Sequence, residues 1–245
     1  MKMLSLANRN AKEILRDPLT ISFSLGFPVI LLLLLSAIQA NIPVALFEIQ
    51  HLTPGITVFG LSFISLFSAT TMVKDRSSAF LQRLYTAPLS PTDFILSYTL
   101  PLVPISVGQT LICYLVAMLL GLTPHINILY AILCIIPVSL LFIGLGLLTG
   151  SIFQNEKQVG GICGALLTNL TAWLSGVWFD LELVGGSFKQ IAYALPFAHA
   201  VELERGLLAG DFAQSLPHLW WVLGYALVIL AVAVVLFLRQ MKRGV

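Results

Sequence analysis

The sequence predicts an all-α integral membrane protein with six transmembrane helices. Three observations lead to this prediction. Hydrophobic residues make up 58% of the chain and charged residues only 10%, whereas a soluble domain has about 25% charged residues. The apolar residues gather in runs of about 20, the length that a helix needs to cross the hydrocarbon core. The lysines and arginines gather in the breaks between these runs, as in loops at a membrane surface.

We expect a single transmembrane domain over residues 1–245, because six spans leave too little chain for a soluble domain. The net charge of +2 is too small to indicate a partner such as nucleic acid. The cysteines lie inside apolar segments, without the spacing of zinc ligands or of a disulfide framework. They are expected to be small core residues: Cys113, Cys134 and Cys163.

Residues 1–18 are predicted to form an amphipathic helix at the membrane interface. Apolar side chains recur there at steps of three and four, and cations occupy much of the remaining surface. Such a helix lies on a membrane with its Lys and Arg side chains toward anionic headgroups. Asp17-Pro18 ends it, since the residue before a proline avoids the α region.

Six apolar segments predict the spans: 19–40, 54–73, 94–122, 128–153, 159–179 and 218–238. Gly26 and Pro28 are expected to bend the first span, and Pro101 and Pro104 to kink the third. The fourth span contains small residues that allow a neighbouring helix to approach closely: Gly144, Gly146 and Gly150.

Residues 180–217 predict a different kind of segment, too long for a turn and not apolar enough to cross. Helical spacing favours two short re-entrant helices at the outer face, before the last span. Pro196 suits the start of the second helix and Gly210 its end, because proline is tolerated in the first turn and glycine adopts the left-handed cap.

The distribution of cations predicts the orientation. Six spans place both termini on the same side, and all 13 Lys and Arg residues except Lys189 and Arg205 fall on that side. Because Lys and Arg are retained in the cytoplasm, we expect both termini and the break at residues 74–93 to be cytoplasmic.

The break at residues 74–93 is the longest polar interruption between the spans, and it has helical spacing in its middle. Two pairs of apolar side chains lie four residues apart on one face: Phe80 with Leu84, and Leu81 with Tyr85. Pro88 and Pro91 end this helix. Two interpretations remain open, a solvated loop and a helix that docks onto a cytoplasmic partner.

The sequence contains few of the patterns that carry chemistry. No charged residue is expected in the middle of a span, which argues against a proton-coupled carrier. No HExxH pattern and no GxxxxGK[ST] loop is present, so we expect no catalytic residues and no ATP site of that type. His199 and Glu202 supply only two potential metal ligands, fewer than a site requires, and no metal is expected.

Three stretches resemble the membrane subunit of type-2 ABC transporters, the export permease family that includes drug and antibiotic resistance permeases. They are RDP at residues 16–18, RLYTAPLS at residues 83–90, and PFAH at residues 196–199 followed by Arg205. The order of the three stretches and the number of spans also match the family, so the resemblance covers essentially the whole chain. Its outer signature segment falls on Pro196, His199 and Arg205.

The resemblance implies that residues 74–93 form a coupling helix in a groove of an ABC ATPase, with a second contact at the break after the fourth span. The implied contact residues are Arg76, Phe80, Leu81, Arg83, Leu84, Tyr85 and Pro88, with Asn155 and Glu156 at the second break. It also implies partners: two copies of the ATPase subunit, which would bind ATP and Mg, a second permease copy in a homodimer, and membrane lipids. No cofactor is expected on this chain.

In the family, the dimer encloses a path lined mainly by the second and fifth spans. Aromatic and polar side chains on these two spans suit an amphipathic ligand: Phe59, Ser62, Phe63, Phe67, Asn169 and Trp173. Packing between helices explains the same residues equally well, because polar groups also bind helices together.

The function implied by the resemblance is ATP-driven export of an amphipathic drug, antibiotic, peptide or lipid across a bacterial or archaeal plasma membrane. One alternative is export of a lipid-linked cell-surface polysaccharide, which would be expected to use a wider, aromatic-lined path. Another is a membrane-embedded enzyme or sensor without an ATPase partner. Copurification of an ATPase separates this last alternative from the other two.

Overall fold

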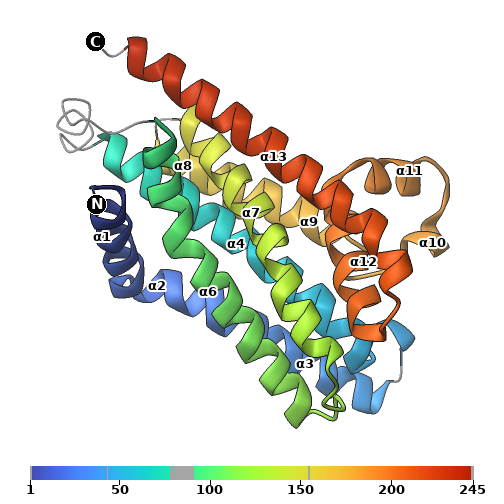
Figure 1. Cartoon of the computed structure of the whole chain (residues 1–245). Helices are drawn as coiled ribbons and strands as arrows, with labels where there is room; N and C mark the ends of the chain where they lie inside the picture. Colours follow the sequence, from blue (N-terminus) through green and yellow to red (C-terminus); the bar gives the residue numbers. More distant parts are fainter. Residues whose placement is uncertain (1, 43, 78–90, 154, 244–245) are drawn as a thin grey trace.

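The computed structural model describes residues 2–42, 44–77, 91–153 and 155–243 (Figure 1). Within these ranges the secondary structure is entirely helical. Five of the described helices are long and apolar enough to cross a membrane. The prediction of an all-α membrane protein is therefore confirmed. The predicted count of six spans stays a prediction, because the predicted fifth span is not among these five helices.

The amphipathic helix is present as α1 (Lys2–Arg16), and it leads directly into the first span. That span is one continuous helical segment of α2 (Pro18–Ile21), the π-helical turn η1 (Ser22–Gly26) and α3 (Phe27–Asn41). Pro28 lacks the N–H that would bond to the carbonyl of Ser24, and the wider π turn lies immediately before it. The expected irregularity near Gly26 and Pro28 is thus a π-helical turn.

The centre of the bundle is α4 (Ile49–Ser77), which follows the short η2 (Ala45–Phe47) and is the most buried span. It packs along α7 (Asn127–Ile152) and α6 (Pro91–Leu119). A side chain at Gly146 of α7 would overlap the backbone carbonyl of Ser65 on α4, and one at Gly150 would lie 3.0 Å from that of Ala69. The glycines therefore permit close packing of α4 and α7, as the sequence indicates.

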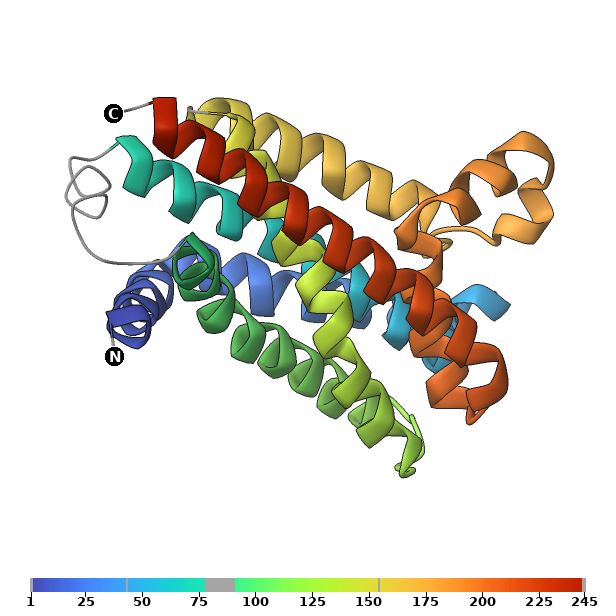
Figure 2. The ribbon, with the colours of Figure 1, turned by 45° about the horizontal axis from the view of Figure 1, so that its top comes forward.

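The predicted fifth span is a shorter, irregular helical segment formed by α8 (Glu156–Val159), the π-helical η3 (Gly160–Leu167) and α9 (Thr168–Leu174). It ends at residue 174 instead of 179 and is not among the five candidate spans. It nevertheless packs against α4 through all three of its parts, and Figure 2 shows it extending along the bundle in yellow and light orange.

Residues 181–209 form three short helices instead of the predicted two, and the last span begins at Phe212 instead of residue 218. They are α10 (Leu181–Val184), α11 (Gly186–Ala194) and α12 (Pro196–Ala209), with α13 (Phe212–Arg243) as the last span. Asp180 caps α10 by accepting from the N–H of Glu182, a signal that the apolar spacing does not contain. The predicted limits of α12 are confirmed, since it starts at Pro196 and is capped by Gly210 in the left-handed conformation.

Both termini, the end of α4 and the start of α6 lie at one end of the bundle, called here the proximal end (Figure 1). The helices α10 to α12 lie toward the other, distal end. The break predicted at residues 74–93 is shorter in the structure. Residues 74–77 belong to α4 and residues 91–93 to α6, which leaves residues 78–90 between the two helices. Pro91 begins α6 because proline is accommodated in a first helical turn.

Candidate coupling site at the proximal end

The last turns of α4 carry a buried carboxylate that joins three helices. Asp75 is only 2% exposed, and its two oxygens accept from the guanidinium of Arg9 on α1 at 2.6 and 2.8 Å. The phenol of Tyr98 on α6 donates to the same carboxylate at 2.6 Å. A bidentate Arg–carboxylate pair is among the stronger polar interactions in proteins, so this cluster ties α1 and α6 to the end of α4.

Further contacts fix α1 in the same position. The amide of the buried Asn10 donates to the carbonyl of Ser97 on α6 at 3.1 Å. Arg9 also donates to Glu13, one turn along α1, at 2.9 Å. Its hydrogen bonds to Asp75 are the main reason that the pKa of Arg9 is raised above its ordinary value. The guanidinium is therefore held in its charged form.

The next residue, Arg76, joins α4 to the C-terminal end of α7. Its guanidinium donates to the carbonyls of Gly150 at 2.8 Å and Ser151 at 3.0 Å, with a longer contact of 3.5 Å to Phe153. The last carbonyls of a helix have no partner within the helix, and a cation there also compensates the negative end of the helix dipole. Arg76 thus caps α7 from α4.

The second predicted contact lies on α8, beside the same end of α4. Asn155 is exposed and caps α8 by accepting from the N–H of Lys157 at 2.9 Å. Glu156 is exposed in the first turn of α8. The structure thus brings Arg76, Asn155 and Glu156 to one region of the proximal end.

The remaining predicted coupling residues lie outside the described residues: Phe80, Leu81, Arg83, Leu84, Tyr85 and Pro88. What the structure provides is the attachment of this segment. On its N-terminal side, Asp75 and Arg76 connect α4 to α1, α6 and α7, and on its C-terminal side it leads into α6.

The predicted signature residues Pro196 and His199 lie on α12, at the distal part of the molecule. The Nδ1 atom of His199 is 2.7 Å from Nδ1 of His218 on α13, and its Nε2 atom is 2.9 Å from the carbonyl oxygen of Tyr193. Since a carbonyl only accepts, Nε2 of His199 carries the proton and Nδ1 accepts from His218. The His199 ring also stacks on Trp221, with centroids 5.0 Å apart, and burial lowers the pKa of His199.

Arg205, the third signature residue, binds carbonyl groups of two other segments. It donates through Nη2 to Gly176 at 3.0 Å and through Nε to His51 at 3.3 Å, and it lies 3.6 Å from Glu202. Burial lowers its pKa, and the neighbouring Glu202 counteracts this effect. Its contacts connect α12 to the chain after α9 and to the start of α4, which is a structural role.

Four of the predicted path residues are buried inside this chain: Phe59, Ser62, Phe63 and Phe67. The ring of Phe63 packs against Phe27 of α3 at 5.2 Å, and the ring of Phe59 against Trp178 at 5.7 Å. The hydroxyl of Ser62 donates to the carbonyl of Phe59 at 2.7 Å. Their place in a path stays a prediction, and it requires this packing to open.

The other two path residues, Asn169 and Trp173, lie on one face of α9, four residues apart. Both are exposed, Trp173 to 56%, and Trp173 packs against Phe179 at 5.8 Å. The amide of Asn169 donates to the carbonyl of Ala165 at 2.7 Å. These two side chains are therefore exposed, whereas the phenylalanines of α4 are buried.

Two features of the described chain escaped the sequence analysis. The Arg9–Asp75 pair joins residues 66 apart, and a single sequence contains no signal for such a pairing. Glu204 on α12 is fully buried, and neither of its carboxylate oxygens has a hydrogen-bond partner. Burial raises the pKa of Glu204 well above its ordinary value, because it disfavours the charged form of the carboxyl group.

The described residues contain no group of three or more His, Cys, Asp or Glu side chains that could hold a metal. The described helices, five of which are long and apolar enough to cross a membrane, define a multi-helix membrane protein. Comparison with known proteins identifies the family. The model of the ABC-2 type transporter family matches residues 1–209, and the chain therefore belongs to this family.

Relatives agree with this assignment. A protein of Porphyra purpurea named as a transport permease (ycf38) is 26% identical over 231 residues, which cover 89% of this chain and 78% of the relative. Its counterpart from Pyropia yezoensis is 25% identical over 228 residues, with the same coverage. Nodulation protein J of Rhizobium leguminosarum bv. viciae is 28% identical over 130 residues, covering 53% of this chain and 50% of the relative. The chain is thus a membrane subunit of an ABC transporter.

Proposed function

We propose that this subunit exports an amphipathic compound and is driven by a separate ABC ATPase that docks on the segment 78–90 and on α8. The observation that carries the proposal is the attachment of that segment. The residues that precede it hold α1 and α6 through Asp75 and α7 through Arg76. Movement of the ATPase against the segment would therefore move several spans together.

An ATPase on another chain fits the composition of this one. The sequence has no GxxxxGK[ST] loop, so ATP and Mg would bind to the partner. The apolar side chains expected on the segment, such as Leu84, need a partner surface. Two ATPase copies and a second permease copy would complete the transporter, with the proximal end facing the cytoplasm of a bacterial or archaeal cell.

An amphipathic substrate is supported by the exposed face of η3 and α9. Asn169 offers an amide and Trp173 an aromatic ring on an otherwise apolar surface. Sites for such ligands combine apolar walls with a few polar groups. In a homodimer, this face would meet its equivalent in the second copy across the path.

The test is reconstitution of the permease with its copurified ATPase in proteoliposomes, followed by ATP-dependent movement of an amphipathic fluorescent probe. The Arg76→Ala variant should retain the ATPase but lose most transport, because the C-terminal end of α7 loses the guanidinium that caps it from α4. Arg239→Ala, which removes the same charge from an exposed residue of α13 outside the proposed docking surface, is the control. Absence of any copurified ATPase would favour an enzyme or sensor, and a copurified lipid-linked sugar would favour polysaccharide export.

A further inference from the structure

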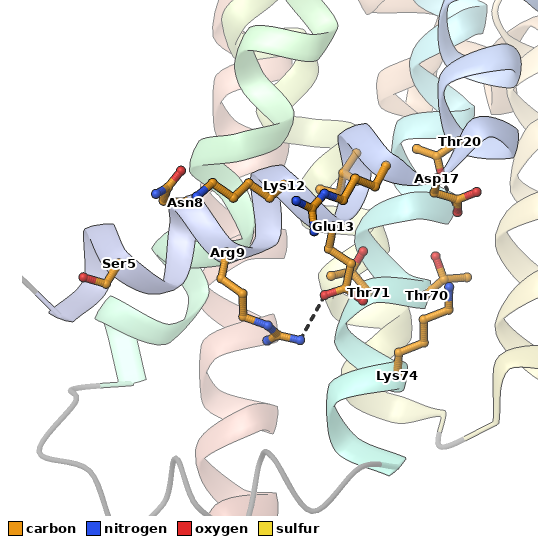
Figure 3. A pocket seen from close by; sticks show the side chains of 12 residues that line it. Ser5, Asn8, Arg9, Lys12, Glu13, Asp17, Thr20, Thr70, Thr71 and Lys74 are labelled. Carbon is orange, nitrogen blue, oxygen red and sulfur yellow. Dashed lines mark hydrogen bonds and ion pairs between the residues drawn. The ribbon is translucent and has the colours of Figure 1, made fainter.

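A polar cavity of about 630 Å³ lies between α1 and the proximal parts of the first two spans (Figure 3). Its walls come from the polar face of α1, from Asp17 and Thr20 at the start of the first span, and from α4. Figure 3 shows the α4 side chains Thr70, Thr71 and Lys74 across from those of α1. The cavity belongs neither to the segment 78–90 nor to the predicted path.

The lining of the cavity carries an excess of positive charge. Cations outnumber anions there: Arg9, Lys12, Arg16 and Lys74 against Glu13 and Asp17. Both anions have partners, because Glu13 accepts from Arg9 at 2.9 Å, while Asp17 accepts from the N–H of Leu19 and the hydroxyl of Thr20. These hydrogen bonds, that of Thr20 first, lower the pKa of Asp17.

Two of the four cations that line the cavity form no ion pair with a described residue. Among the residues that the structure describes, Lys12 and Arg16 take part in no ion pair. Both are exposed, one turn apart on the face of α1 that lines the cavity. Their charge is therefore available to an anion that enters the cavity.

The depth of the cavity points to the membrane as the source of that anion. The first candidate span begins at Pro18 and the second ends at Arg76, and the cavity is lined by residues close to these limits, from Arg16 to Thr20 and from Thr70 to Lys74. The ends of apolar spans lie at the level of the lipid headgroups. A phosphate of a phospholipid would lie at this depth.

An apolar groove lies on the other flank of α1, and its presence favours a lipid over a soluble anion as the ligand. The groove has a volume of about 570 Å³ and is lined by side chains of α1, of the first span and of α6, among them Leu4, Leu15 and Ile105. Asn8 lines both the cavity and the groove. A ligand with an anionic head and a hydrocarbon tail would find both environments on the same helix.

We propose that this cavity binds the headgroup of an anionic phospholipid, with the phosphate between Lys12, Arg16 and Lys74. The hydrocarbon chain would enter the groove beyond Asn8. This inference is independent of the proposed function, because it concerns the membrane around the permease and not the ATPase or the exported compound. A bound lipid would hold α1 at the membrane surface. The pair of Arg9 with Asp75 attaches the same helix to α4.

The test is native mass spectrometry of the delipidated permease, titrated separately with phosphatidylglycerol and phosphatidylcholine of identical acyl chains. The unmodified chain should bind phosphatidylglycerol at least tenfold more tightly. Replacing both cations in Lys12→Gln/Arg16→Gln should reduce phosphatidylglycerol affinity by about 10- to 30-fold, as expected for two surface cations. The control Lys157→Gln/Arg239→Gln removes the same charge from exposed residues outside the cavity and should leave the affinity unchanged.

Each other outcome would overturn the proposal. Equal affinity for the two lipids would mean that Lys12 and Arg16 belong to an ordinary solvated surface. An equal loss in the control variant would mean that only net charge matters. Displacement of phosphatidylglycerol by millimolar inorganic phosphate would indicate a soluble anion. Loss of the copurified ATPase by the double variant, with lipid binding unchanged, would assign the cavity to the protein partner.

Discussion

The buried carboxylate of Asp75 accepts two hydrogen bonds from Arg9 and one from Tyr98. The negative charge of Asp75 pairs with the guanidinium of Arg9. The Asp75→Asn substitution preserves the shape but removes the charge that pairs with Arg9. Because hydrogen bonds to charged groups contribute about 1.5–3 kcal/mol, we expect a loss of stability in this range. Denaturant unfolding of the detergent-solubilised permease measures it.

The matched control is Glu13→Gln, which removes the other carboxylate that Arg9 contacts. Its side chain is 41% exposed, so solvent screens the pair and the loss should stay below about 1 kcal/mol. An equal effect of the two substitutions would show that Asp75 is no more than a surface partner of Arg9.

The buried Glu204 predicts how the stability of the protein depends on pH. Its pKa is raised from 4.5 by burial, so the folded state retains a proton that the unfolded state loses as the pH rises through about 4.5. Stability therefore falls with rising pH until the carboxyl ionises in the folded state as well. The Glu204→Gln substitution removes this contribution, since glutamine does not titrate.

Thermal unfolding of the two proteins between pH 5 and pH 8 tests this sign. The stability of Glu204→Gln relative to the unmodified chain should increase with pH, by up to about 1.4 kcal/mol per pH unit. A difference that is constant over this range would mean that Glu204 has an ordinary pKa in the folded protein.

At the scale of elements, the close packing of α4 and α7 depends on glycine. A side chain at Gly146 would overlap the carbonyl of Ser65 and the side chain of Ser68. The backbone of α4 cannot move aside cheaply, so Gly146→Ala should separate the two helices, with a cost of about 1–3 kcal/mol from overpacking. Gly224→Ala on α13 is the control, since a side chain there meets nothing within 4 Å.

The two variants are compared by their thermal unfolding and by the yield of monodisperse protein. We expect a clear loss for Gly146→Ala and a small gain for Gly224→Ala, because alanine favours helix over glycine. If both variants were as stable as the unmodified chain, the packing of α4 on α7 would have to differ from that described.

The positions of most helices could be predicted from local signals in the sequence, whereas several limits could not: α4 and α13 extend beyond the predicted spans at both ends. The apolar spacing defines α1, Pro196 and Gly210 delimit α12, and long apolar runs define the spans. Errors arose where a local signal was weak or ambiguous. The capped α10 is too short to show periodicity, and the fifth segment is interrupted by the π-helical η3. The first span likewise contains η1, which no periodicity indicates.

The site could be predicted less well than the fold, because its contacts join distant parts of the chain. Composition and spacing direct attention to the break after α4, but the partners of Asp75 and Arg76 lie on α1, α6 and α7. Likewise, the phenylalanines of α4 form a stripe in the sequence whether they face a path or a neighbouring helix. The structure shows what they contact within one chain: Phe63 packs against Phe27, and Phe59 against Trp178.

At the scale of the whole molecule, the orientation in the membrane is the first question. The distribution of cations predicts a cytoplasmic proximal end. Single cysteines at the exposed positions Gln158 and Ser187, in a chain whose native cysteines are replaced, should react with membrane-impermeant reagents from the cytoplasmic and the outer side, respectively. Labelling of the Ser187 position only from inside would contradict this orientation.

The measurement that tests the central claim most directly is copurification of the ATPase with Leu84→Asp, compared with Ser90→Asp. Both positions lie outside the described residues, and the expectation rests on the helical spacing around Leu84. Burial of such a side chain contributes about 1.5–3 kcal/mol, and an unpaired buried charge costs a few kcal/mol more. Leu84→Asp should insert normally but lose the ATPase and transport, while Ser90→Asp retains both. Undiminished ATPase binding and transport in Leu84→Asp would contradict a coupling role for this segment.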